Sequence, residues 1–258
     1  LGDRLLNAVR SLAFYLEKTV LPFHLSALYP FPRPLSLWTA WFWGSAAVVI
    51  GITGFCVWRW RRGERFWLVA WAAYLVMVAP VLGLLQVGRQ AAADRYTYLP
   101  LLGLYFLAGG GVARFWDRTG RPGAVPLLQP VGAVLGAALL GGLVGLTVHQ
   151  TAVWKNSETL WRNAVTLYPH RLPTAHLNLG KYYLRHGSLD AAEAEFQAAL
   201  EIQPQRVEAL NGLGQVAYRR GRWDAAESFY VSALRQGPDA IVHNNLGLVY
   251  AQLGRDRE

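Results

Sequence analysis

The chain has 258 residues, of which 53% are hydrophobic and 16% charged, and its formal net charge is +9. Residues 1–150 hold 13 Lys and Arg against 5 Asp and Glu, a net of +8, whereas residues 151–258 hold 12 against 11, a net of +1. The basic excess belongs to the apolar half, so it points to loops facing anionic lipid and argues against a nucleic-acid partner, and the single cysteine excludes a disulfide framework.

Residues 1–35 are expected to lie on the outer face of a membrane. Charged Glu17 and Lys18, followed by Pro22, argue against a membrane span. An amphipathic helix in the interface is predicted instead, followed by a stiff extended connector over the proline-rich residues 29–34. The apolar side chains at helical spacing are Leu5, Val9, Leu12, Leu16 and Val20.

Residues 36–150 are predicted to form a four-helix transmembrane region. Roughly 20 apolar residues cross a hydrocarbon core of about 30 Å, and exposed backbone in that core must be helical. Pro80 lies inside the second segment and is expected to kink it. The four apolar segments are residues 38–58, 66–85, 98–113 and 125–148.

The arginines of the short loops predict the orientation of these segments. Residues 59–65 contain four arginines and residues 114–122 contain three, whereas the loop between the second and third segments has only Arg89 and Arg95. The rule that basic loops stay inside then places the first two loops in the cytoplasm. The chain is thus expected to be a multi-pass membrane protein with everything after His149 on the non-cytoplasmic side.

Residues 151–258 repeat with a spacing of 34 residues. The order Leu, Gly, Tyr, Gly, Ala, aromatic, Ala and Pro occurs twice, with the second tyrosine one place late, and a third copy begins with Leu246-Gly247, one residue short of the register. This is the tetratricopeptide pattern, in which each repeat is a pair of helices. We expect a half repeat, two full repeats and the start of a third, stacked as a helical solenoid. The two full sets are Leu179, Gly180, Tyr183, Gly187, Ala192, Phe196, Ala199 and Pro204, and Leu213, Gly214, Tyr218, Gly221, Ala226, Tyr230, Ala233 and Pro238.

The first helix of each repeat should line a concave groove. Asparagine side chains can bond both the N–H and the C=O of an extended peptide, so a protein or peptide is the predicted occupant. A concave face that is merely solvated remains the alternative. The candidate groove residues are Asn178, Lys181, Arg185, Asn211, Gln215, Arg219, Asn244 and Asn245.

Three stretches carry a resemblance to a known family. ADRYTYLPLLGLY at residues 93–105, YLEKTVLPFHLSALYPFP at residues 15–32 and WKNSETLWRNAV at residues 154–165 resemble parts of membrane tetratricopeptide-repeat proteins of the O-mannosyltransferase type. The resemblance implies the C-terminal part of an all-α, GT-C-type glycosyltransferase that transfers sugar from a polyprenyl-phosphate carrier. In that family the acidic catalytic residues lie in an outer loop near the N-terminus, and this chain has no matching loop, so its catalytic residues stay unknown.

A donor site is the second hypothesis drawn from the sequence. Arg89 and Arg95 are expected at the outer membrane edge, where guanidinium groups suit a lipid phosphate, and Tyr96 and Tyr98 could stack on a sugar. Interfacial anchoring is the alternative. The six histidines show no metal-ligand spacing, so no metal and no cofactor resident in this chain are predicted.

Two functions of different classes therefore remain open. The chain is either the C-terminal part of a protein O-glycosyltransferase, whose repeats present the acceptor, or a membrane-anchored scaffold without chemistry of its own. Both predict membrane lipid and a protein as partners.

Overall fold

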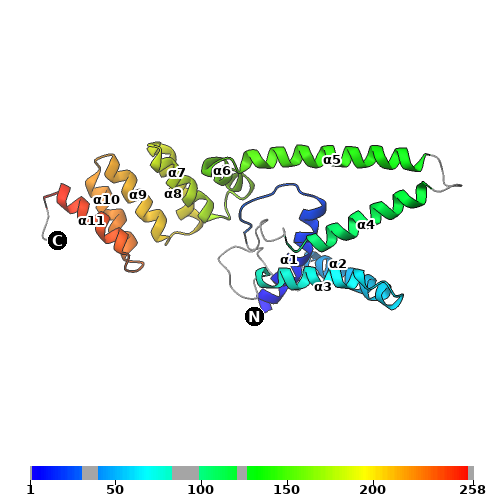
Figure 1. Ribbon diagram of the computed structural model, residues 1–258. Coiled ribbons are helices and arrows are strands. Elements are labelled where there is room, and N and C mark those ends of the chain that lie inside the picture. The colour runs from blue at the N-terminus through cyan, green and yellow to red at the C-terminus, as the bar shows by residue number, and fades with distance from the viewer. Residues whose placement is uncertain (1, 31–39, 83–98, 121–126, 255–258) are drawn as a thin grey trace. The chain divides into compact units, whose positions relative to one another are not determined.

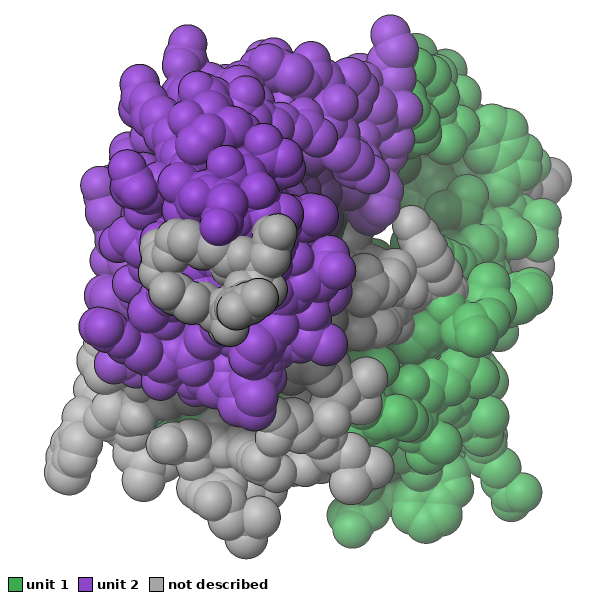
Figure 2. Space-filling view, turned by 90° about the vertical axis from the view of Figure 1, so that its left-hand side faces the viewer, with its two compact units in different colours: residues 1–151 green, residues 152–258 purple. Residues whose placement is uncertain are grey.

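The computed structural model shows an all-α protein. Eleven α-helices and one short 3-10 helix lie within the described residues. Their contacts divide the chain into two compact units, Leu1–Thr151 and Ala152–Glu258, which are coloured separately in Figure 2. The structure describes residues 2–30, 40–82, 99–120 and 127–254.

In the first unit α1 packs on α2, α2 on α3, and α3 on α4 (Figure 1). Tyr74 of α3 donates a hydrogen bond of 3.0 Å from its hydroxyl to the carbonyl oxygen of Leu12 in α1. Trp71 stacks on Tyr74 and donates from Nε1 to the Thr53 hydroxyl of α2 at 2.9 Å. The helices are α1 (Gly2–Val20), α2 (Ala40–Arg61), α3 (Phe66–Val78), the 3-10 helix η1 (Ala79–Val81), α4 (Leu102–Thr119) and α5 (Leu128–Val153).

The buried face of α1 differs from the predicted leucine and valine stripe. Leu12 is buried, but Val20 at the end of the helix is 77% exposed. Small and polar side chains take the place of the stripe, and α1 packs against neighbouring helices along this side. The buried residues of α1 are Asn7, Ala8, Ser11, Leu12 and Tyr15.

Two of the described helices, and not four, are long and apolar enough to cross a membrane: Trp41–Arg61 in α2 and Leu128–Val153 in α5. The prediction of four such helices is therefore corrected. The apolar side chains of α5 are exposed on all sides, as in a helix surrounded by hydrocarbon, and none of its residues is buried.

The helices α3 and α4 are too short to cross a membrane, for a different reason in each. In the 66–85 segment the α-helix ends at Val78, and Pro80 sits in the following 3-10 helix, because proline cannot donate the helical hydrogen bond. In α4 the apolar part ends before Arg114, Asp117 and Arg118, so about 12 residues remain, which rise about 18 Å in a helix. That is well below the thickness of a hydrocarbon core.

The second unit consists of consecutive helix pairs (Figure 1). The side chain of Asn156 caps the N-terminus of α6 by accepting a hydrogen bond from the Thr159 amide. Asp239 caps the N-terminus of α11 by accepting hydrogen bonds from two backbone amides. Gly187 and Gly221 turn the chain between paired helices at φ of 78° and 72°, a region that glycine adopts without strain. The helices are α6 (Ser157–Leu167), α7 (Pro173–Arg185), α8 (Leu189–Ile202), α9 (Val207–Arg219), α10 (Trp223–Leu234) and α11 (Ala240–Gln252).

The buried residues of this unit recur in successive helix pairs, in step with the sequence repeat. Phe196 of α8 and Tyr230 of α10 are 0% and 1% exposed, and each is flanked by two fully buried alanines. A Cβ on Gly180 would lie 2.8 Å from Cε1 of Phe196, so the glycine is what lets α8 approach α7. The prediction of tetratricopeptide helix pairs is confirmed.

Candidate functional site

Three helices of the second unit form one layer. α7 packs directly on α9, and α9 packs directly on α11, while α8 and α10 each pack between successive members of that series. We call α7, α9 and α11 the inner layer, and α8 and α10 the outer helices. The inner layer contains every residue predicted from the sequence to line the groove.

Two side-chain hydrogen bonds join neighbouring helices of the inner layer. Asn245 of α11 donates from Nδ2 to Oδ1 of Asn211 in α9 at 2.8 Å. Arg219 of α9 donates from Nη1 to the carbonyl oxygen of Leu184 in α7 at 2.6 Å, which satisfies a carbonyl near the end of α7. Both bonds link neighbouring helices of the inner layer side chain to side chain or side chain to backbone.

The predicted groove residues differ in exposure. Lys181, Arg185, Arg219 and Asn244 are exposed, whereas Asn178, Asn211, Gln215 and Asn245 are half-buried. On α7 the polar side chains Asn178, Lys181 and Arg185 share one face, because they are three and four residues apart.

The asparagine pair keeps bonding capacity for a ligand. An amide side chain offers two donors and an acceptor with two lone pairs. The mutual bond uses one donor of Asn245 and one lone pair of Asn211, so both donors of Asn211 and the acceptor of Asn245 take no part in it. Sequence analysis found both residues but not the bond between them.

His176 is a buried polar residue that the sequence analysis did not place. Its side chain lies in α7 with Nδ1 2.7 Å from Oε2 of Glu195 in α8, and with Nε2 2.7 Å from the carbonyl oxygen of Pro169. Both partners are acceptors, so both contacts are hydrogen bonds only when both ring nitrogens carry a proton. The hydrogen bond with Glu195 raises the pKa of His176 against the opposing effect of burial, and the Pro169 carbonyl adds to the rise.

Ion pairs and side-chain hydrogen bonds also link helices of successive repeats. Arg220, which follows α9, pairs with Asp190 and Glu193 of α8. Arg162 of α6 pairs with Glu158 and donates to the hydroxyl of Tyr183 in α7 at 2.8 Å. The contacts of Arg220 with the two acids and of Arg162 with Tyr183 join residues 21 to 30 apart in sequence, so a local sequence pattern does not predict them.

The candidate donor-site residues Arg89, Arg95, Tyr96 and Tyr98 lie outside the described residues. Within the described ranges, no group of three or more His, Cys, Asp or Glu side chains is arranged to hold a metal ion.

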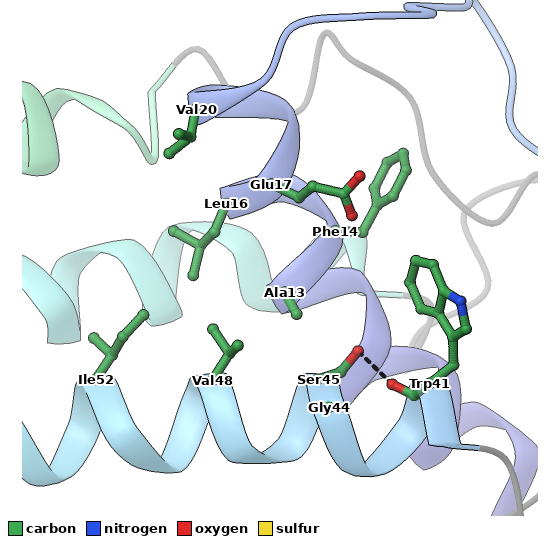
Figure 3. Close-up of a pocket in the computed structure, with 10 residues that line it drawn as sticks. All are labelled: Ala13, Phe14, Leu16, Glu17, Val20, Trp41, Gly44, Ser45, Val48 and Ile52. Carbon is green, nitrogen blue, oxygen red and sulfur yellow. Dashed lines mark hydrogen bonds between the residues drawn. The ribbon is translucent and has the colours of Figure 1, made fainter.

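In the first unit α1 and α2 border an open pocket of about 720 Å³ (Figure 3). Its walls are apolar apart from the Glu17 carboxylate and the Ser45 hydroxyl, which donates to the Trp41 carbonyl oxygen at 3.0 Å. Such a lining suits a hydrocarbon chain. The lining residues are Ala13, Phe14, Leu16, Glu17, Val20, Trp41, Gly44, Ser45, Val48 and Ile52.

Comparisons with known proteins agree with the repeat architecture. The profile of the tetratricopeptide repeat matches residues 177–241 and 213–258. Over 170 residues the chain is 28% identical to protein O-mannosyl-transferase TMTC1 of Mus musculus, a match that covers 65% of this chain and 17% of that protein. It is 31% identical over 122 residues to the Homo sapiens TMTC1, covering 47% of this chain and 13% of that protein.

The relative from Drosophila melanogaster, protein O-mannosyl-transferase Tmtc2, is 28% identical over 116 residues, which are 45% of this chain and 11% of that protein. The chain thus spans less than a fifth of the length of these curated relatives. It carries tetratricopeptide repeats and is distantly similar, over part of its length, to the TMTC protein O-mannosyl-transferases.

Proposed function

We propose that this chain is the C-terminal part of a membrane protein O-glycosyltransferase that uses a polyprenyl-phosphate-linked sugar, and that its repeats present the acceptor or another protein partner. The observation that carries the binding role is the inner layer, whose exposed cations and partly satisfied asparagines lie along three adjoining helices. The similarity to protein O-mannosyl-transferases supports the reaction class.

The proposal divides the chain into three parts. Residues 1–35 form an outer-surface segment, residues 36–150 the membrane region, and residues 151–258 the repeat array on the non-cytoplasmic side. α2 and α5 cross the bilayer, and the shorter α3 and α4 enter it as a pair beside them. The pocket between α1 and α2 then holds hydrocarbon of the surrounding lipid.

The donor phosphate is assigned to Arg89 and Arg95, with Tyr96 and Tyr98 beside the sugar. A planar guanidinium can donate two parallel hydrogen bonds to phosphate oxygens, which lysine cannot. This part of the proposal rests on the sequence alone, and it predicts that Arg95→Ala weakens donor binding more than Arg95→Lys does.

Peptide binding by the inner layer is tested with the full chain in lipid nanodiscs. Extended peptides are selected from a random library on the immobilised protein, and their affinities are measured by fluorescence anisotropy. The triple variant Asn178→Ala, Asn211→Ala, Asn244→Ala is expected to bind about tenfold more weakly, because each lost hydrogen bond is worth about 0.5–1.5 kcal/mol.

A matched control is the triple variant Gln197→Ala, Gln205→Ala, Gln236→Ala, which removes exposed amides outside the inner layer. It should bind like the parent. Equal affinities for both triple variants would remove the inner layer from peptide binding.

The glycosyltransferase role needs a separate test. The matching region of mouse TMTC1 is replaced by this chain, and sugar transfer to acceptor protein is measured. Retained transfer that falls in the asparagine triple variant supports the proposal. A chimera that is produced and folded but transfers equally well with and without the three asparagines would separate the repeats from acceptor binding.

The second candidate function, a membrane-anchored scaffold, is favoured by the repeat profile, since tetratricopeptide repeats suggest protein–protein interaction. Peptide binding together with a folded chimera that transfers no sugar would support the scaffold.

A further inference from the structure

The helices of the repeat unit segregate charge by layer. The outer helices α8 and α10 carry Asp190, Glu193, Glu195, Glu201, Asp224 and Glu227 and no lysine or arginine. The inner layer carries Lys181, Arg185 and Arg219 against the single acid Glu208. The outer helices therefore have a net charge of −6 and the inner layer one of +2, although the chain from residue 151 onward is close to neutral.

The three cations of the inner layer lie close together. Lys181 and Arg185 are one helical turn apart on α7. Arg219 reaches them from α9, because its Nη1 bonds the carbonyl of Leu184, the residue beside Arg185. We call Lys181, Arg185 and Arg219 the basic stripe.

Acidic side chains of the described residues do not neutralise this stripe. Within the described part of the chain, the ion pairs of the second unit join Arg162, His176, Arg206 and Arg220 to acids, and none joins a member of the basic stripe. Glu208, the acid of the inner layer, lies 3.3 Å from Nε of Arg206. Three acids of the outer helix α8 pair elsewhere: Asp190 and Glu193 with Arg220, and Glu195 with His176.

Exposed cations without an acidic neighbour create a positive potential over a surface, and that potential selects a partner of opposite charge. Asparagines beside the stripe supply hydrogen bonds to a peptide backbone without regard to its sequence. We infer that the inner layer binds an extended protein segment rich in aspartate and glutamate, an assignment that rests on the proposed peptide-binding function and specifies its partner.

The test uses the full chain in phosphatidylcholine nanodiscs and three fluorescent peptides of equal length. They have the same Gly and Ser background and carry evenly spaced glutamates, glutamines or lysines. The glutamate peptide is expected to bind about three- to a hundredfold more tightly than the glutamine peptide, since each of the three exposed cations can form an ion pair worth about 0.2–1 kcal/mol. Its affinity should fall with added salt, and the lysine peptide should not bind.

Two charge variants separate the stripe from the overall charge of the protein. Lys181→Gln, Arg185→Gln, Arg219→Gln should abolish the preference for glutamate. Lys155→Gln, Arg222→Gln, Arg235→Gln removes the same charge from exposed residues outside the inner layer and should retain the preference.

Each contrary result has its own meaning. Equal binding of the glutamate and glutamine peptides, both weakened by the asparagine variant, would overturn the acidic preference and leave the peptide-binding function standing. Binding of no peptide, including those selected from the library, would overturn both. A third result would assign the basic stripe to a membrane surface and overturn the inference. In that case phosphatidylserine nanodiscs displace the glutamate peptide, and the stripe variants lose binding to the nanodiscs but keep binding to the peptide.

Discussion

At the scale of the residue, His176 ties together two segments of the repeat unit through both ring nitrogens. Glu195 of α8 and the carbonyl of Pro169 accept from the same ring, and Glu201 adds a smaller favourable charge. The folded state therefore raises the pKa of His176 above the value of about 6.5 expected in an unfolded chain. The resulting stabilisation is complete below that pH and is lost as pH rises through the folded-state pKa.

We predict that α7 and α8 open more readily as pH rises from about 5 to 9, after correction for the intrinsic exchange rate. Hydrogen exchange measured by mass spectrometry checks this. His176→Gln should cost about 1–3 kcal/mol at the acidic end, because buried acceptors lose a donor, and should flatten the pH dependence. The same pH dependence in the parent and in His176→Gln would assign it to another group.

Residue-level contacts were only partly predictable from the sequence. The asparagines at 211 and 245 stood out because amides recur on successive first helices. The role of His176 did not, because a histidine beside Leu177 on an apolar face has no distinctive local pattern. Its partner Glu195 lies 19 residues away, at a place that only the packing of α8 on α7 determines.

At the scale of the element, the packing of two of the helix pairs depends on a glycine facing an aromatic ring. A Cβ on Gly214 would overlap the buried ring of Tyr230, as one on Gly180 would crowd Phe196. Gly247 of α11 takes the same place in the third copy, but a Cβ there meets nothing within 4 Å.

These glycines should respond oppositely to alanine. Gly214→Ala is expected to destabilise the repeat unit by about 1–3 kcal/mol, because the extra methyl group overpacks a rigid core. Gly247→Ala should be neutral or stabilise by up to about 1 kcal/mol, because alanine is the better helix former. Urea unfolding followed by circular dichroism measures both, and a larger loss at Gly247 than at Gly214 would contradict the packing seen here.

Elements were predicted well where a period was long and regular. The repeat helices were predicted from a spacing of 34 residues, because the core residues of a helix pair occur twice at that spacing. The sequence predicted too many membrane helices, because the hydropathy of a segment gives its apolar length but not the residue at which the helix ends. Pro80 stopped one helix early, and Arg114, Asp117 and Arg118 left another with too short an apolar part.

At the scale of the whole molecule, the proposed topology has two membrane crossings, α2 and α5, and it therefore places residues 1–35 and the repeat array on the same side. On that topology Arg62 and Arg118 lie on the side opposite the repeats, and the abundance of arginine there predicts the cytoplasm.

Single cysteines in a Cys56→Ser background test this orientation. In intact cells an impermeant maleimide should label Arg235→Cys and leave Arg62→Cys and Arg118→Cys unlabelled until the membrane is opened. All three positions are exposed. Labelling of Arg62→Cys and Arg118→Cys, but not of Arg235→Cys, would reverse the proposed orientation.

The empty space over Gly247 also bears on how stability is distributed along the repeats. In a solenoid each helix is held mainly by its nearest neighbours, so cooperativity is local. Among the described helices α11 packs on α10 and α9, and Ile241 and Leu248 on it are exposed. Because no atom of the described residues comes within 4 Å of a Cβ on Gly247, the amides of α11 should exchange faster than those of α7 and α9. A partner that spans the inner layer would then order α11 as it binds, and a substitution that stiffens this helix would tighten binding without touching the partner at all.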